Sequence, residues 1–290
     1  MDKGYNRADE MFKDIARRIL EEGCMDINPR PRYADGTPAH TLSINHVMQS
    51  YDLSKGELPL ITLRPIAIKS SIGELLWIYQ DQSNSLDVLR DKYNVTWWDE
   101  WDIGDRTIGA CYGETVRRHN LMNNLLNDIQ NNPDGRRHII NMWQEDDFKD
   151  KHGLKPCAYQ TVWNVRHGKD GKDYLDMCLF QRSSDYATAG IINQMQYVIF
   201  QMLVARHCGY EAGRFTWFVA NIQIYDRHIE PIKEMLNRES VECSPRIEIN
   251  PDKKNFYDIT IDDVKITGYP REIIKEQNPF SLRTRIIIIT

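Results

Sequence analysis

The stretch LKPCAYQTVWNV holds the side chain with the clearest potential for covalent chemistry. Cys157 follows Pro156 at the start of a segment, 158–167, whose alternating pattern predicts a strand. A cysteine thiolate is a strong nucleophile, and a nearby positive charge lowers the pKa of the thiol. Arg182 ends another predicted strand, so we expect it to lie near the thiol, where it could also bind an anion. A single cysteine is more often a small core residue, so its neighbours must decide between the two roles.

Four more polar residues are candidates for a function. Glu74 lies in the apolar stripe of a predicted helix, where burial should raise the pKa of its carboxyl. Asn193 also lies in an apolar segment, and a buried amide needs partners for its donor and its acceptor. Arg136 and Arg137 follow the turn NPDG; such pairs are usually solvated, but arginine is also a favoured group for binding phosphate.

The elements that must position these residues are helices and strands without a regular strand–helix alternation, which indicates an α+β fold around one sheet. The sequence contains no internal repeat, low-complexity tract or Pro/Ser-rich linker, so we expect one domain over residues 1–290. Helical or alternating spacing of apolar residues identifies the elements. The predicted helices are 8–22, 67–82, 119–131, 190–210 and 226–238. The predicted strands are 136–143, 158–167, 174–183 and 214–225, together with the segment 34–53, which begins with a turn and continues as a strand. A late hairpin is predicted in 257–269.

The composition excludes several classes of protein. With 41% hydrophobic and 27% charged residues the chain can form a sizeable core, and it contains no apolar run long enough to span a membrane. The net charge of −5 argues against a nucleic-acid polymer as partner. Six cysteines without a CxxC pair indicate reduced thiols and no zinc site, so we expect a cytoplasmic protein without a metal.

Eight short motifs then give a resemblance. DGTPAHTLS, ELLWIYQ, NVTWWDEW, IGACYG, NPDGRRHI, KPC, QRSSD and QIYDRHI occur in the order found in the thymidylate synthase family. The chain resembles that family from about residue 8 to its C-terminus. The resemblance implies a single α+β domain on a large twisted mixed sheet with packed helices, and a homodimer that forms through the sheet face.

The resemblance also implies the chemistry. Cys157 would add to C6 of the uracil ring of dUMP, and C5 could then attack the methylene carried by the cosubstrate 5,10-methylenetetrahydrofolate. Glu74 would transfer protons at O4 and C5 through water, and Asn193 would read the pyrimidine edge. No metal is needed for this reaction.

The remaining residues would bind the two substrates. Arg136 and Arg137 would reach across the dimer interface to the 5′-phosphate bound by the partner subunit. Asp185 would bind the folate pterin, and Trp98 and Tyr112 would line the cavity, Trp98 on the folate side. The other residues implied to bind the nucleotide are Arg30, Gln181, Arg182, Ser183, Gln223 and Tyr225, the last at the ribose 3′-OH.

Several positions depart from the family pattern. Ala158 replaces a histidine that usually follows the nucleophile, and AGIIN, 189–193, replaces Gly-x-Pro-Phe-Asn. Ala220-Asn221 replaces Gly-Asp, Gln223 replaces a histidine, and Thr290 is an unusual terminus. Glutamine can still bond a hydroxyl, so the change at Gln223 is compatible with nucleotide binding.

Three functions remain open. The first is reductive methylation of dUMP to dTMP, in which the folate also gives hydride. The second is a hydroxymethylase, in which water traps the same intermediate; Ala158 and Asn221 favour access of water, and Asn193 favours dUMP over dCMP, because deoxycytidylate enzymes usually carry Asp there. The third is a non-catalytic nucleotide-binding relative, against which intact Cys157 and Glu74 argue.

Overall fold

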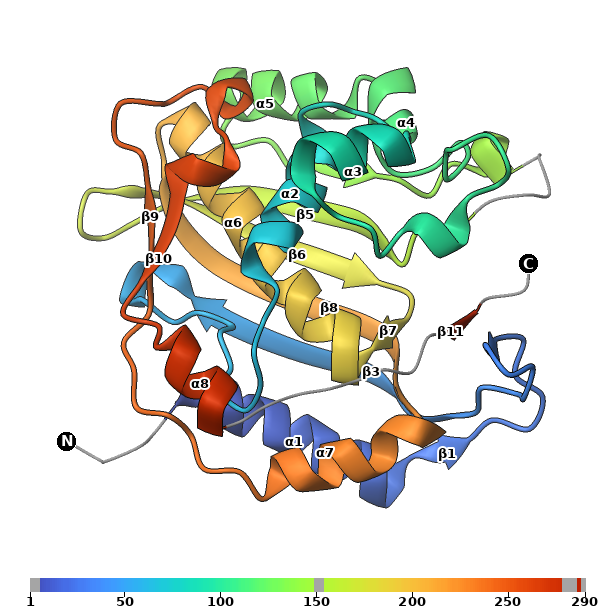
Figure 1. Ribbon diagram of the computed structural model, residues 1–290. Helices are drawn as coiled ribbons and strands as arrows, with labels where there is room; N and C mark the ends of the chain where they lie inside the picture. Colours follow the sequence, from blue (N-terminus) through green and yellow to red (C-terminus); the bar gives the residue numbers. More distant parts are fainter. Residues whose placement is uncertain (1–5, 149–153, 278–285, 288–290) are drawn as a thin grey trace.

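A mixed sheet forms the centre of the molecule (Figure 1). The computed structural model describes residues 6–148, 154–277 and 286–287, and within them seven strands form this sheet in the order β1-β3-β8-β6-β5-β4, with β7 beside β8. β3 is antiparallel to β8, whereas β6 is parallel to β8, which confirms the α+β class. The strands are β1 (Cys24–Met25), β3 (Thr41–Asp52), β4 (Ile139–Asn141), β5 (Ala158–His167), β6 (Asp173–Gln181), β7 (Ser184–Asp185) and β8 (Glu211–Tyr225).

The long strands have one buried and one partly exposed face, because successive side chains of a strand point to opposite sides. Phe215 and Trp217 of β8 are buried, as their alternation in the sequence predicts. On the other face the rings of Phe180 and Phe218 lie 5.7 Å apart, and Met48 is 67% exposed. That face therefore presents apolar side chains to its surroundings.

Two helices cover the buried face of the sheet (Figure 1). α6, Ile191–Cys208, packs on β6 and β8, and α2, Ile68–Tyr79, packs on α6. The ring of Tyr79 stacks on that of Phe200 with 4.0 Å between centroids. α6 ends at Gly209, whose φ of 84° is a conformation that glycine adopts without steric cost. The helix predicted over 190–210 is confirmed.

The other helices border this two-layer core. α1 packs against β3 and α7, and α5 packs against α4, α6 and β4. No helix within the described ranges is long and apolar enough to cross a membrane. The remaining elements are α1 (Arg7–Glu22), α3 (Leu86–Tyr93), α4 (Gly113–Arg118), α5 (Leu121–Asn131), α7 (Ile229–Leu236), α8 (Arg271–Gln277), β2 (Arg32–Tyr33), β9 (Arg246–Ile249), β10 (Val264–Thr267) and β11 (Ile286–Ile287).

The predicted hairpin within 257–269 is wrong. The segment holds 3₁₀ turns and a single strand, β10, which pairs with β9 further upstream. The Asp263 carboxylate accepts hydrogen bonds from the backbone N–H and the hydroxyl of Thr260, at 2.8 and 2.7 Å. This side-chain bonding closes a turn where the alternating pattern suggested a strand.

Candidate active site

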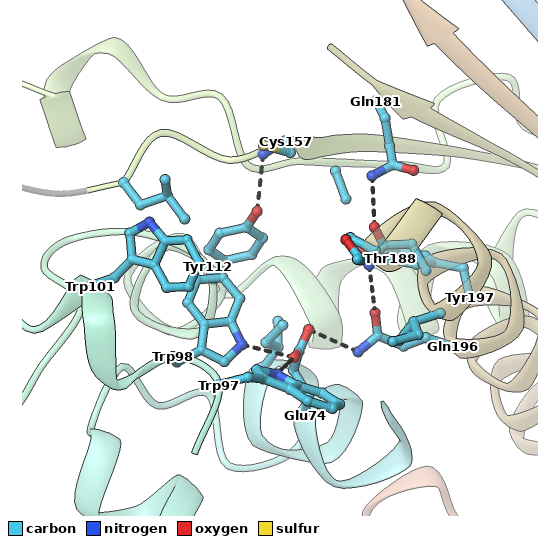
Figure 2. Close-up of a pocket in the computed structure, with 16 residues that line it drawn as sticks. Glu74, Trp97, Trp98, Trp101, Tyr112, Cys157, Gln181, Thr188, Gln196 and Tyr197 are labelled. Atoms are coloured by element: carbon cyan, nitrogen blue, oxygen red, sulfur yellow. Dashed lines mark hydrogen bonds between the residues drawn. The ribbon is translucent and has the colours of Figure 1, made fainter. Parts of the chain in front are cut away.

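A cavity of about 350 Å³ lies between the ends of the central strands and the helices α2 and α6 (Figure 2). Cys157, Glu74 and Asn193, which are far apart in the sequence, all line it. Its wall is mostly apolar with a few polar groups, as in typical small-molecule sites. The lining residues are Glu74, Ile78, Trp97, Trp98, Trp101, Tyr112, Leu154, Cys157, Ala158, Gln181, Thr188, Ala189, Ile192, Asn193, Gln196 and Tyr197.

Cys157 lies in the bend before β5 and is partly exposed. Its backbone N–H donates to the phenol oxygen of Tyr112 at 3.0 Å, and its carbonyl accepts from the backbone N–H of Arg182 at 2.9 Å. Both polar groups of the backbone at Cys157 are therefore bonded, one to the segment before α4 and one to the end of β6. The thiol is held at a defined point of the cavity wall.

Arg182 lies near this thiol, as the sequence predicts. Burial raises the pKa of Cys157, while the positive charges of Arg182 and then Arg30 oppose that rise. The guanidinium of Arg182 also donates to the carbonyls of Pro156 at 3.0 Å and Lys155 at 2.9 Å. Arg182 therefore fixes the segment that carries the cysteine, in addition to placing a charge beside it.

Glu74 projects from α2 and is buried. The indole N–H groups of Trp97 and Trp98 both donate to its Oε2, Trp98 at 2.7 Å, and Gln196 donates to its Oε1 at 3.1 Å. Burial raises the pKa of Glu74, and the donors Trp98, Gln196 and Trp97 oppose the rise. The predicted burial is confirmed, and the direction of the pKa shift is the one that burial predicts; a buried carboxyl of this kind can serve in proton transfer.

Asn193 lies in the first turn of α6, and both the oxygen and the nitrogen of its amide make hydrogen bonds. Gln181 donates to its Oδ1 at 3.0 Å, and its Nδ2 donates to Gln196 at 3.4 Å. The predicted need for two partners is confirmed. Asn193 also lines the cavity, so its remaining N–H and oxygen lone pair can meet a ligand.

Other predicted residues gather where β7 meets the end of β8. The Ser183 hydroxyl donates to Gln223 Oε1 at 3.1 Å, and Asp185 lies opposite Gln223 in the sheet. Burial raises the pKa of Tyr225, and the nearby Asp185 and Cys157 raise it further. This group is therefore adjacent to the cysteine, although it does not line the cavity itself.

Three of the predicted arginines are exposed: Arg30, Arg136 and Arg137. Arg137 borders a different hollow, beside α5 and β4, and neither it nor Arg136 lines the cavity of its own chain. Of these three, Arg30 is the one whose charge lowers the pKa of Cys157, as that of Arg182 also does. One chain therefore does not bring the whole predicted arginine set together.

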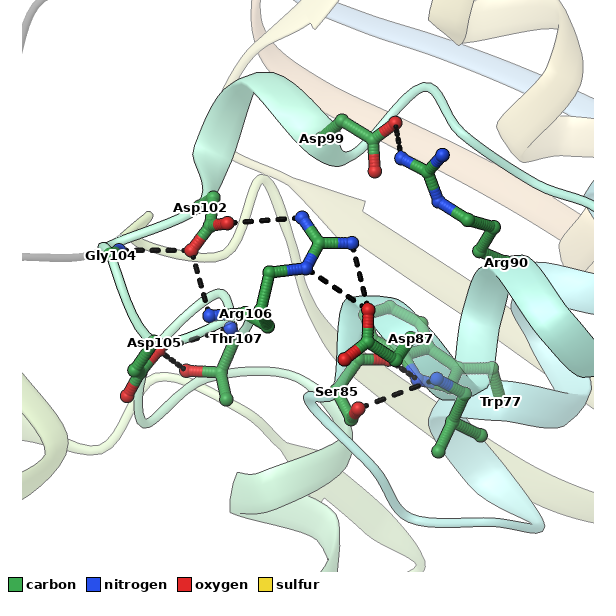
Figure 3. Close-up of polar contacts among 11 residues, drawn as sticks. Trp77, Ser85, Asp87, Arg90, Asp99, Asp102, Gly104, Asp105, Arg106 and Thr107 are labelled. Atoms are coloured by element: carbon green, nitrogen blue, oxygen red, sulfur yellow. Dashed lines mark hydrogen bonds and ion pairs between the residues drawn. The ribbon is translucent and has the colours of Figure 1, made fainter.

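The loop that follows the tryptophan segment 97–101 is closed by charged side chains (Figure 3). Arg106 donates to Asp87 at 3.0 and 2.9 Å and to Asp102 at 3.1 Å. Asp102 also accepts from the backbone N–H groups of Gly104 and Arg106, at 2.9 and 3.0 Å. These contacts fix the loop. The segment just before it, 97–101, places the indoles of three tryptophans in the cavity wall.

Several polar and aromatic residues of the cavity wall are not identified from the sequence: Trp97, Trp101, Thr188, Gln196 and Tyr197. Two signals could have found some of them. Trp97 and Trp101 belong to the same motif as Trp98, and Gln196 is three residues after Asn193, which places both on one face of α6.

Of the departures from the family pattern, Ala158 lines the cavity and is buried. Asn221 instead bonds to Asn45 at 3.1 Å and does not line it. Thr290 lies outside the described residues. Within the described ranges, no cluster of three His, Cys, Asp or Glu side chains could hold a metal ion.

Comparisons with known proteins agree with this geometry. The family description "Thymidylate synthase" matches residues 10–277. Thymidylate synthases of Streptococcus pneumoniae (strain 70585) and Streptococcus sanguinis (strain SK36) are each 48% identical over 95% of this chain, covering 99% and 98% of those proteins. The solved structure of thermostable thymidylate synthase A from Bacillus subtilis is similar with a TM-score of 0.86 at 35% identity, over 96% of this chain and 99% of that one. The chain belongs to the thymidylate synthase family.

Proposed function

We propose that this chain catalyses the reductive methylation of dUMP to dTMP, with 5,10-methylenetetrahydrofolate as the cosubstrate. The observation that carries the proposal is the shared cavity of the Cys157 thiol, the Glu74 carboxyl and the Asn193 amide. The reaction on the pyrimidine requires a nucleophile, a group that transfers protons and a group that binds the base, and these three side chains can supply them. Relatives named thymidylate synthase, at 48% identity, support it.

Cys157 acts as the nucleophile. Its thiolate adds to C6 of uracil, the electrons move to C5 and O4, and C5 can then form a bond to the one-carbon unit. Glu74, whose pKa burial raises, moves protons at O4 and C5 through water. Tyr112 and Arg182 hold the peptide of Cys157 during these steps.

The nucleotide is bound at several points around the cysteine. Asn193 and Gln181 face the base, and Tyr225 with Gln223 holds the ribose. Phosphate needs positive charge, which Arg182 and Arg30 supply near Cys157. The residues that we assign to the nucleotide are Arg30, Gln181, Arg182, Ser183, Asn193, Gln223 and Tyr225.

The folate supplies the one-carbon unit to C5, which then loses its proton as tetrahydrofolate departs and leaves an exocyclic methylene on the ring. Hydride from the tetrahydrofolate reduces this methylene, the Cys157 thiolate leaves C6, and the products are dTMP and dihydrofolate. The aromatic wall of the cavity fits a flat pterin ring, because Trp97, Trp98 and Trp101 all line it. Asp185, which lies partly buried in β7 beside the end of β8, can accept hydrogen bonds from the pterin.

The active form is a homodimer, formed through the apolar sheet face that carries Met48, Phe180 and Phe218. Two features support this state: the exposure of Met48, and the position of Arg136 and Arg137 outside their own cavity. Each of these arginines then binds the phosphate in the partner subunit. We also propose that the chain is one domain, because a single core cluster includes buried residues from Ala8 to Val264.

Analysis of the product tests the proposal. The protein, dUMP and the folate should give dTMP together with dihydrofolate, which is detected by its ultraviolet absorbance and by chromatography. Hydroxymethyl-dUMP with tetrahydrofolate would instead identify the hydroxymethylase. Binding of dUMP without any conversion would identify a non-catalytic relative.

A further inference from the structure

A series of hydrogen bonds runs from β8 to α2, and Figure 2 shows the part of it that lines the cavity, from Gln181 to Glu74. The indole N–H of Trp217 donates to Oε1 of Gln181, and Nε2 of Gln181 donates to Asn193 at 3.0 Å. Asn193 donates to Oε1 of Gln196 at 3.4 Å, and Nε2 of Gln196 donates to Glu74 at 3.1 Å. This series of hydrogen bonds therefore connects the Asn193 amide, which meets the base, to the Glu74 carboxyl, which moves protons.

At each end of this series, the partners of the glutamine permit its amide to hydrogen-bond in only one orientation. At the α2 end, Gln196 faces the backbone carbonyl of Ser71, also at 3.1 Å, and the carboxyl of Glu74. The backbone carbonyl of Ser71 can only accept, so the NH₂ group of Gln196 must face it and the oxygen of Gln196 must face Asn193. Gln196 is buried, so water cannot replace these partners without a cost.

At the β8 end, the indole of Trp217 can only donate, so the oxygen of Gln181 faces it and the NH₂ group of Gln181 faces Asn193. Asn193 consequently receives a donor on one side and an acceptor on the other. Turning its amide over would place NH₂ against NH₂ at Gln181 and oxygen against oxygen at Gln196. The surroundings therefore select one orientation of Asn193.

We propose that Gln196 is a specificity-determining positioning residue, which fixes the Asn193 amide in the orientation that fits uracil and rejects cytosine. The inference rests on the proposed function, in which Asn193 meets the base. The free N–H of Asn193 can donate to O4 of uracil, and its free lone pair can accept from N3–H. Cytosine presents an amino donor and a bare ring nitrogen at these places, so both contacts are mismatched.

Gln196→Met tests this inference, because it keeps the length of the side chain and removes its hydrogen bonds with Asn193, Ser71 and Glu74. We expect the dCMP-to-dUMP ratio of dissociation constants and the dUMP-to-dCMP ratio of kcat/KM each to fall about tenfold, because one of the two hydrogen bonds that orient the Asn193 amide is lost. Gln194→Met is the matched control: Gln194 is buried on the same helix but lines a different hollow. It should keep the wild-type ratio.

Gln196→Glu separates the acceptor contact with Asn193 from the donor contacts with Ser71 and Glu74. A carboxylate can still accept from Asn193, so preference for dUMP should be retained, while a second acid beside Glu74 should move the pH profile of turnover. Unchanged preference in a folded Gln196→Met, or lost preference in Gln196→Glu, would overturn the inference. If wild-type protein neither binds nor converts dUMP, the proposed function fails instead, so the two failures are distinguishable.

Discussion

The phenol oxygen of Tyr112 accepts a hydrogen bond from the backbone N–H of Cys157 at 3.0 Å, across 45 residues of sequence. Tyr112 is itself fixed: it is buried, and its ring meets that of Trp98 edge-on with 5.2 Å between centroids. The position of Cys157 therefore depends on a tyrosine that also packs against a tryptophan of the cavity wall.

Tyr112→Phe removes this contact and leaves the ring in place. We expect kcat to fall about tenfold, and the free energy of unfolding to fall by about 1 kcal/mol, because the N–H of Cys157 loses its acceptor. Tyr197→Phe is the control, since Tyr197 also lines the cavity but bonds to Tyr79. Steady-state kinetics with urea unfolding measure both effects; equal losses of kcat in the two variants would contradict the role of Tyr112.

Cys157→Ser should abolish turnover and retain dUMP binding, because a hydroxyl near neutral pH is a far weaker nucleophile than a thiolate. Cys208→Ser, at the end of α6, should remain active. With 5-fluoro-dUMP and the folate, denaturing electrophoresis should show a covalent adduct with wild type and Cys208→Ser only. Substantial turnover by Cys157→Ser would rule out the covalent mechanism.

The sequence predicts some parts of this site better than others, for physical reasons. α6 and the burial of Glu74 could be predicted because local spacing of apolar residues determines which face is buried. The contact of Tyr112 with Cys157 could not be, because no local pattern specifies a hydrogen bond between distant segments. The strand pairing of β10 was missed for the same reason: alternation predicts a strand but not its partner.

The pH dependence of activity should follow Glu74. Trp98 is the donor that most opposes the rise in its pKa, so Trp98→Phe should raise that pKa further. Because proton transfer through water needs the ionised carboxyl, the acidic limb of the kcat/KM profile should move to higher pH. Trp101→Phe is the control, since its indole N–H has no acceptor among the described residues; the same displacement there would contradict the assignment.

The raised pKa of Glu74 also determines how the free energy of unfolding changes with pH. The pKa of Glu74 is raised in the folded state, so the native protein binds this proton more tightly than the unfolded chain does. Its contribution is present at low pH and is lost as pH rises from about the unfolded pKa, near 4.3, to the folded pKa. Trp98→Phe should steepen this loss, which urea unfolding at several pH values would measure.

Arg106→Ala should loosen the loop that follows the tryptophans. The ion pairs of Arg106 with Asp87 and Asp102 are partly exposed, so the free energy of unfolding should fall by less than about 1 kcal/mol. The KM for the folate should rise severalfold, whereas the KM for dUMP should change little. Arg117→Ala, which removes another exposed ion pair, serves as control. A rise in the KM for both substrates would mean that Arg106 does not act only through the tryptophans of the cavity wall.

Mixed dimers test whether the site is shared between subunits. Arg136→Ala should weaken dUMP binding by about 1.5 to 3 kcal/mol, because a charged hydrogen bond to phosphate is lost. A subunit with Arg136→Ala and a subunit with Cys157→Ser are each inactive or weak alone. When they are unfolded and refolded together, one site of each mixed dimer combines an intact Cys157 with an intact Arg136 from the other subunit. Recovery of up to half of the wild-type activity in the mixed dimers would follow, whereas an absence of rescue would mean that each chain builds its site alone.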